Sequence, residues 1–164
     1  MVLVIIASLA TVATPSLGKV LTRNRVAAAR SELVGALQDA RAAAISTGRQ
    51  TLVCPSSDGA RCTPNVRWDG GWLQARDADR NSQPDGAPVH VGNRYTGRLA
   101  IQSSNGRQLV RFHPDGSAGG SNLTLLFCSP GDPASALTVV LANSGRVRAA
   151  PATPTQATAC AQLH

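Results

Sequence analysis

Two arginines near the carboxyl terminus carry the clearest chemical signal in the sequence. The segment Gly145-Arg-Val-Arg148 follows a predicted tight turn, so Arg146 and Arg148 fall on one face of the strand that begins there. A guanidinium group presents a planar fork of N–H donors that matches phosphate oxygens, whereas a lysine offers a point charge. All but one of the 16 basic residues are arginine, and the net charge is +7. The chain is therefore predicted to bind an anionic, phosphate-bearing partner.

Four further arginines would widen this basic surface if they lay on the same face. They are Arg94, Arg98, Arg107 and Arg111. The alternative interpretation is that the arginines only keep the domain soluble or contact neighbouring protein chains. The tight turn before Arg146 favours binding for the pair, whereas the sequence leaves both interpretations open for the other four.

No arrangement of residues typical of catalysis occurs in the chain. The histidines lie far apart in the sequence, and no motif marks a serine as a nucleophile. Asp77 and Asp79 stand among arginines in a predicted loop, which is most simply a solvated charge cluster rather than a metal site. The other residues considered for catalytic roles are His90, His113, His164, Ser56 and Ser57. We therefore expect no enzymatic activity, no metal and no cofactor.

Four cysteines allow three disulfide connectivities, with a zinc site as the structural alternative. No close Cys-x-x-Cys pair occurs, which argues against zinc. Cys54 and Cys62 bracket a Pro-Ser-Ser-Asp-Gly turn that brings their ends together, so this local pair is preferred. Cys128 and Cys160 then pair by elimination and would tie down the carboxyl-terminal tail. Two disulfides are typical of a protein exported to an oxidising compartment.

The elements that would position these groups begin with one long helix. Met1–Leu17 is an uncharged apolar run, and Lys19–Gly48 continues it with apolar residues at three- and four-residue steps. Gly48 is expected to end the helix in the left-handed conformation. Pro15 predicts a kink or local melting over residues 11–15. The apolar stripe consists of Val26, Ala29, Leu33, Leu37, Ala40 and Ala44.

The chain divides into three predicted parts. Residues 1–22 are interpreted as a membrane or fibre anchor, 23–48 as the amphipathic half of the same helix, and 49–164 as a globular β domain. A membrane span needs about 20 apolar residues, so the run looks cut short at its amino terminus. A secretory signal places positive charge before its apolar run, but here Lys19 follows it. A buried core helix and an unrelated signal-anchor helix are the alternatives.

Turn-forming residues separate a series of β-like segments after the helix. Asn143-Ser-Gly145 predicts a hairpin over Leu137–Ala149, and residues 77–93 are expected to form a long surface loop. The tail at 151–158 is too poor in apolar bulk to fold alone. Because aromatic residues make up only 3% of the chain, two tryptophans, Trp68 and Trp72, are favoured as core residues over a base-stacking role. The predicted strands are Gln50–Cys54, Gly71–Arg76, Arg98–Gln102, Gln108–Phe112, Leu123–Phe127, Leu137–Ala142 and Arg146–Ala149.

Two parts of the chain resemble type IV pilins and pseudopilins. The run Val4–Leu17, passing into a basic amphipathic helix, is similar to the amino-terminal helix of that class, although the basic leader, the processing site and the glutamate of the class are absent. The order of motifs in the FimT/GspH group of minor pilins is matched by Cys54-Pro-Ser-Ser-Asp-Gly-Ala-Arg-Cys62, Trp68-Asp-Gly-Gly-Trp72, Asp77 and Phe112-His-Pro-Asp-Gly116. The resemblance is nearest to FimT. It implies an α+β type IV pilin fold, in which a long amino-terminal helix packs on a globular antiparallel β-sheet domain. Ala75 stands where the group usually has an aromatic residue.

The resemblance also implies a function. The FimT group carries a Gly-Arg-x-Arg element associated with DNA binding, and Gly145–Arg148 matches it. We therefore expect a minor type IV pilin that binds extracellular double-stranded DNA without sequence preference, aiding DNA uptake in natural transformation and pilus assembly. Its other partners would be minor and major pilins and, before assembly, the bacterial inner membrane, with the domain in the periplasm and later in the extracellular pilus. The alternative is a purely structural minor pilin or a type II secretion pseudopilin with only protein partners.

Overall fold

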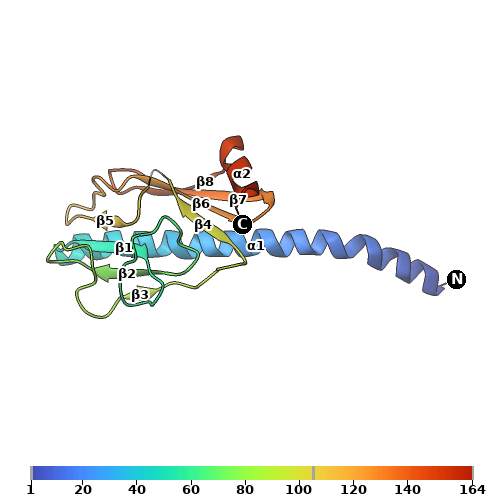
Figure 1. The fold of residues 1–164 in the computed structure, drawn as a ribbon, viewed down its shortest axis with the longest axis horizontal. Helices are drawn as coiled ribbons and strands as arrows, with labels where there is room; N and C mark the ends of the chain where they lie inside the picture. The colour runs from blue at the N-terminus through green and yellow to red at the C-terminus, as the bar shows by residue number, and fades with distance from the viewer. Residues whose placement is uncertain (1, 105, 164) are drawn as a thin grey trace.

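The computed structural model describes the backbone of residues 2–104 and 106–163 and the side chains of residues 18–104 and 106–163. One long helix, α1 (Val2–Thr47), runs the length of the molecule. Its amino-terminal part projects alone, and the globular domain packs along its carboxyl-terminal half (Figure 1). Within these described residues, eight strands and a short second helix follow α1. The expected α+β class is confirmed.

The helix buries the face that its sequence predicts. All six residues of the apolar stripe are at most 1% exposed. The helix ends at Thr47, and Gly48 adopts a φ of +62°, which confirms the predicted left-handed cap. The helix is unbroken at Pro15, so the predicted local melting is wrong. A proline removes one backbone donor, and a long helix accommodates this by bending; Figure 1 shows a gentle bend in the projecting part.

The strands form two antiparallel sheets, each of four strands. The first sheet has the order β3-β2-β1-β5, and the second has the order β4-β6-β7-β8. In Figure 1 the second sheet lies above α1, with α2 and the carboxyl terminus on the same side. The bounds are β1 Thr51–Pro55, β2 Trp72–Arg76, β3 His90–Val91, β4 Ala100–Ser103, β5 Val110–Phe112, β6 Leu123–Ser129, β7 Asp132–Leu141 and β8 Val147–Pro151.

One core joins the inner faces of both sheets to the helix stripe. The first sheet contributes Val53 and Phe112 to it, and the second contributes Ile101, Leu125 and Phe127. Trp68, between β1 and β2, and Trp72, the first residue of β2, also belong to this core and are at most 1% exposed, which confirms that they are packing residues. Fully burying a large apolar side chain stabilises a fold by about 1.5–3 kcal/mol, so each of these large residues contributes on that order.

The predicted strands correspond to β1, β2 and β4 to β8, with ends shifted by a few residues. The predicted hairpin over Leu137–Ala149 is confirmed, because β7 and β8 pair antiparallel with Leu141 opposite Val147. The loop predicted at 77–93 contains one short strand, β3, which adds to the edge of the first sheet by pairing with β2. A two-residue strand has no periodicity that sequence analysis can detect.

One prediction for the same loop is wrong. Asp77 is 0% exposed rather than solvated. The Gln50 side chain donates a 2.7 Å hydrogen bond to its Oδ2, and the backbone N–H of Ser82 donates a 3.2 Å bond to its Oδ1. Because the loop folds back over the end of β2, these donors replace water around the carboxylate. Asp79, two residues later, is exposed as expected.

The tail forms a short helix that the sequence analysis did not predict. This helix, α2 (Pro154–Ala161), begins with a capping box in which Thr153 and Gln156 satisfy each other's backbone N–H groups. It packs on the outer face of the second sheet, where Cys160 joins Cys128 and Ala100 in a small buried cluster. The structure contains a Cys128–Cys160 disulfide here and a Cys54–Cys62 disulfide beside β1. Both bonds have the pairing expected from the sequence.

Candidate functional site

The β7–β8 hairpin presents both candidate arginines to solvent. The backbone N–H of Gly145 donates to the carbonyl of Ala142 at 2.9 Å, and that of Ala142 donates to the carbonyl of Arg146 at 3.1 Å. Val147 packs against the core, whereas Arg146 and Arg148 on either side of it are exposed. Alternate residues of a strand point to opposite faces, so the structure brings the two arginines together on the outer face of the second sheet.

The turn before Arg146 requires a glycine for two independent reasons. Gly145 has a φ of +77°, where residues with a side chain are strained. A Cβ atom added at this position would also lie 1.9 Å from the carbonyl oxygen of Gly116. The hairpin turn is therefore packed directly against the backbone of the turn at His113–Gly116.

A third arginine, Arg41 of α1, holds these two turns together. Its Nε donates a 2.9 Å hydrogen bond to the carbonyl of Gly116, and its Nη2 donates a 3.4 Å bond to the carbonyl of Ser144. The sequence analysis did not single out Arg41. No local pattern marks it, because its partners lie 75 and 103 residues away. Arg41 positions the loop that carries Arg146 and is itself half-buried.

Among the described residues, no carboxylate neutralises either candidate arginine. In the part of the chain that the structure describes, the ion pairs are Arg67 with Asp69 and His90 with Glu32. Both guanidinium groups of the hairpin are thus exposed and unpaired within these residues. An exposed, unpaired guanidinium is available for bidentate hydrogen bonding to a phosphate.

The four weaker candidates are not gathered on this surface. Arg111 lies on β5 of the other sheet and donates a 2.6 Å hydrogen bond to the hydroxyl of Ser82. Arg94 donates to the carbonyl of Ser57 beyond β1. Arg98 precedes β4, at the end of that strand away from the hairpin turn. These three do not extend the surface of Arg146 and Arg148.

Arg107 is the one weaker candidate at the same end of the second sheet as the hairpin turn. Its backbone N–H donates to the carbonyl of Ser104 at 3.1 Å, and the N–H of Ser104 donates to Thr124 of β6 at 2.9 Å. The Arg107 side chain is half-buried, and its Nε has no hydrogen-bond partner among the described residues. A partly buried guanidinium reaches an external phosphate less readily than the exposed pair does.

A polar cluster fastens α1 to the loop after β3. The Tyr95 hydroxyl donates a 2.6 Å hydrogen bond to Glu32 Oε2, and the backbone and side-chain nitrogens of Asn93 donate to Oε1 at 3.1 Å. Burial raises the pKa of Glu32, but these bonds lower it more, so that it lies below the ordinary 4.5. Burial and the bond to Glu32 raise the pKa of Tyr95 to about 12. These three hydrogen bonds therefore hold the loop after β3 to the helix.

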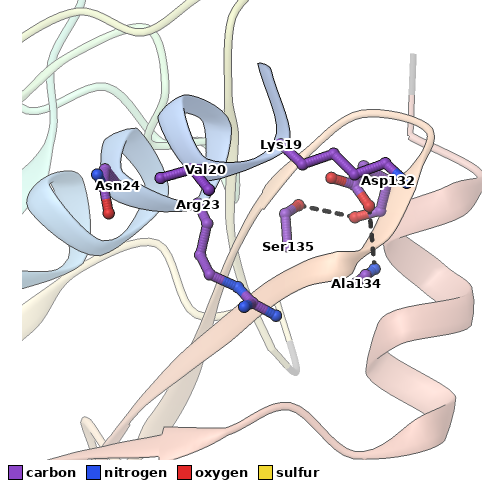
Figure 2. Close-up of a pocket in the computed structure, with 7 residues that line it drawn as sticks. All are labelled: Lys19, Val20, Arg23, Asn24, Asp132, Ala134 and Ser135. Atoms are coloured by element: carbon purple, nitrogen blue, oxygen red, sulfur yellow. Dashed lines mark hydrogen bonds between the residues drawn. The ribbon is translucent and has the colours of Figure 1, made fainter. Parts of the chain in front are cut away.

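A hollow of about 380 Å³ lies where α1 leaves the domain (Figure 2). Lys19 and Arg23 line it from the helix, and Asp132 and Ser135 line it from β7. The Ser135 hydroxyl donates to the Asp132 carbonyl at 2.7 Å, and the backbone N–H of Ala134 donates to Asp132 Oδ1 at 3.2 Å. The lining of this hollow therefore carries charges of both signs, and the Asp132 carboxylate offsets part of the positive charge that Lys19 and Arg23 would present to a phosphate.

The other candidates for chemistry are engaged in structure. The Ser56 hydroxyl donates to Asp58 and accepts from the N–H of Gly59. His90 lies against the ring of Trp72, with ring centroids 5.2 Å apart. Among the described residues no three His, Cys, Asp or Glu side chains are grouped to hold a metal, and no cysteine is free. His164 lies outside the described residues.

Comparison with known families decides which group the chain belongs to. A family model described as Type II transport protein GspH matches residues 29–145, which is more than half of the chain. The chain belongs to the GspH family. This is a pilin-like family and not an enzyme family. Its further assignment to FimT stays a prediction.

Solved structures show the same fold. The chain is similar to the type IV minor pilin FimU of Pseudomonas aeruginosa strain PAO1 in two crystal forms. The first is 21% identical, with a TM-score of 0.65 over 79% of this chain and 90% of that chain. The second is also 21% identical, with a TM-score of 0.61 over 76% and 91%. At this identity the likeness concerns the fold alone, and the expected type IV pilin fold is confirmed. No curated protein matches the chain.

A helix that crosses a bilayer needs about 20 predominantly apolar residues. Over the residues that the structure describes, no helix combines the length and hydropathy needed to cross a membrane. The predicted anchor depends on the side chains of residues 1–17, which the structure does not describe.

Proposed function

We propose that this GspH-family protein is a minor type IV pilin that binds double-stranded DNA through Arg146 and Arg148, without sequence preference. In this role it would aid DNA uptake in natural transformation as well as pilus assembly. The observation that carries the proposal is the pair of exposed, unpaired guanidinium groups on a turn that Arg41 and Gly116 hold rigidly. Phosphate contacts of this kind supply most of the affinity in non-specific DNA binding.

The proposed setting follows from the rest of the chain. Residues 1–22 would hold the protein in the bacterial inner membrane before assembly and would pack against minor and major pilins in the fibre. The domain would then lie in the periplasm or on the extracellular pilus, and two disulfides suit such a compartment. A surface of two arginines implies weak binding, with a dissociation constant of about 10⁻⁴–10⁻⁶ M. Several copies or several pilins in one fibre would compensate through avidity.

The test compares charge-matched double variants of the full chain in a non-ionic detergent. Arg146→Gln/Arg148→Gln removes both proposed contacts. The control, Arg76→Gln/Arg80→Gln, removes two exposed arginines, one at the end of β2 in the first sheet and one in the loop that follows it. Binding to a short DNA duplex is measured by gel shift and by fluorescence anisotropy at several salt concentrations. The first variant should lose binding and flatten the logarithmic salt slope by about 1.8, at about 0.9 per phosphate contact.

The control variant should bind like the parent. Equal loss in both variants would mean that net charge alone matters, and parental binding by the first variant would mean that the hairpin is structural. Either result favours the second candidate function, a type II secretion pseudopilin or structural pilin with only protein partners. The match to the Type II transport protein GspH model supports that candidate.

A further inference from the structure

We propose that the groove between α2 and the outer face of the second sheet is a second contact site for DNA, which takes the sugar-phosphate backbone of one strand as it passes Arg148. This inference rests on the DNA binding proposed above and extends it to uncharged residues. The groove has a volume of about 180 Å³, and its lining includes Gln102, Ser104, Thr124 and Gln156.

Strand register places the groove beside the arginine. Arg148 of β8 lies opposite Val140 of β7, and Val140 lies opposite Thr124 of β6. Residues opposite one another in a sheet point to the same face, and neighbouring strands are about 4.8 Å apart. Arg148 and Thr124 therefore lie on one face with about 10 Å between their backbones. Measured along the axis of a duplex, this distance corresponds to about three base steps, at a rise of about 3.4 Å per nucleotide of one strand.

The chemistry of the lining suits a phosphodiester backbone. Hydroxyl and amide side chains are common phosphate and sugar contacts in protein–DNA complexes. Of the described residues that line this groove, none is a carboxylate. The hollows at α1, by contrast, contain Asp132 in one case and Glu32 with Asp39 in another. A carboxylate would repel the strand. Another depression without a carboxylate, beside Ser82, lies near Arg111 on the first sheet and away from Arg148.

The polar groups of the groove are held in place before any ligand arrives. The hydroxyl of Ser104 accepts from the N–H of Thr124 at 2.9 Å, and the N–H of Ser104 donates to the carbonyl of Thr124 at 2.9 Å. The side-chain oxygen of Gln156 accepts from the N–H of Thr153 at 2.8 Å, which leaves the amide N–H groups of Gln156 as donors. Preorganised donors lose little conformational freedom on binding.

The test places a charge in the groove and an equal charge elsewhere. In the full chain, Gln102→Glu introduces a carboxylate among the lining residues, and the control Gln38→Glu introduces one on the exposed face of α1. Affinity for a DNA duplex is measured by fluorescence anisotropy in a non-ionic detergent. Gln102→Glu should weaken binding about fivefold or more relative to the control, because the like charge would lie against a phosphate.

A neutral variant separates contact from long-range repulsion. Thr124→Val keeps the shape of the side chain and removes the hydroxyl, so binding should weaken about 2- to 10-fold. The salt slope should not change, because an uncharged contact releases no counterions, whereas Arg148→Gln should flatten it by about 0.9. Circular dichroism checks that each variant is folded.

Three outcomes would contradict the inference that DNA binds in this groove. If Gln102→Glu binds like Gln38→Glu while the parent binds DNA through the hairpin, the groove inference is wrong and the proposed function stands. Unchanged affinity in Thr124→Val would have the same meaning, since the effect of Gln102→Glu would then be repulsion at a distance. If the parent itself binds no DNA, the proposed function fails and the groove inference fails with it.

Discussion

Replacing Gly145 by alanine tests whether the close packing of two turns holds the arginine hairpin. The substitution leaves every charge in place and adds a single methyl group. That carbon would lie 1.9 Å from the carbonyl oxygen of Gly116 and 3.0 Å from Nε of Arg41. Real Cβ atoms essentially never come within 3.0 Å of another group, so the hairpin turn has to move away from its partner.

The expected cost has two parts. An alanine in the left-handed conformation, at the φ of +77° found here, costs about 1–2 kcal/mol. Moving the turn breaks the two hydrogen bonds from Arg41 to the carbonyls of Gly116 and Ser144. Each bond contributes about 0.5–1.5 kcal/mol, so the sum is about 2–5 kcal/mol. For a domain of this size, the midpoint of thermal unfolding should fall by about 8–20 °C.

A matched control separates the cost of the steric contact from the cost of the backbone strain. Gly131, in the turn between β6 and β7, has nearly the same φ of +76°, but a Cβ there meets nothing within 4 Å. Gly131→Ala should therefore cost only the strain of about 1–2 kcal/mol. Both variants are compared by denaturant unfolding, and Gly145→Ala should also bind DNA more weakly although its charge is parental. If the two variants differ by less than about 0.5 kcal/mol, the packing argument for the rigid hairpin is refuted.

Three further predictions follow from other contacts. Replacing both cysteines of a bond by serine should destabilise the domain by about 3.7 kcal/mol for Cys128–Cys160 and about 2.5 kcal/mol for Cys54–Cys62, because the loops they close span 32 and 8 residues. A non-reduced peptide map that links the cysteines differently would contradict the assignment. Because hydrogen bonds hold the pKa of Glu32 below 4.5 in the folded protein, this carboxylate contributes stability above that pH, which is lost as the pH falls through its folded pKa. Glu32→Gln should therefore show a smaller loss of thermal stability between pH 6 and pH 3 than the parent, and equal losses would count against the cluster. Deleting residues 1–25 should leave a soluble, folded domain, because the first buried residue of the described helix side chains is Val26; insolubility of this fragment under oxidising conditions would contradict the anchor interpretation.

Local patterns in the sequence predicted the framework of the domain. The stripe from Val26 to Ala44 identified the buried face of α1, because helix periodicity and burial coincide along one element. The hairpin was predicted from Asn143-Ser-Gly145 and the alternating residues on either side of it. These features depend on residues only a few positions apart along the chain, so the sequence alone is enough to predict them.

The elements that were missed depend on contacts between distant segments. The strand at His90–Val91 exists because it pairs with β2, and α2 is docked by a disulfide that joins residues 32 positions apart. Asp77 is buried because Gln50 and a returning loop supply its hydrogen bonds. The pairing of β3 with β2 and the hydrogen bond from Gln50 to Asp77 join segments that are not adjacent in sequence, so no local pattern indicated them. The helix α2 differs, because its capping box of Thr153 and Gln156 is a local signal that the sequence analysis overlooked.

The candidate site divides in the same way. The sequence by itself determined which residues could bind phosphate, since residue type, a tight turn and strand alternation already place Arg146 and Arg148 on one exposed face. Only the tertiary structure decided which surface they occupy: Arg41 and Gly116 hold the turn, while Arg94, Arg98 and Arg111 are directed to other parts of the molecule. The physical reason is that spacing along the chain alone decides which residues share one face of a strand. Which residues of different strands lie together on the surface depends instead on how the two sheets pack on the helix.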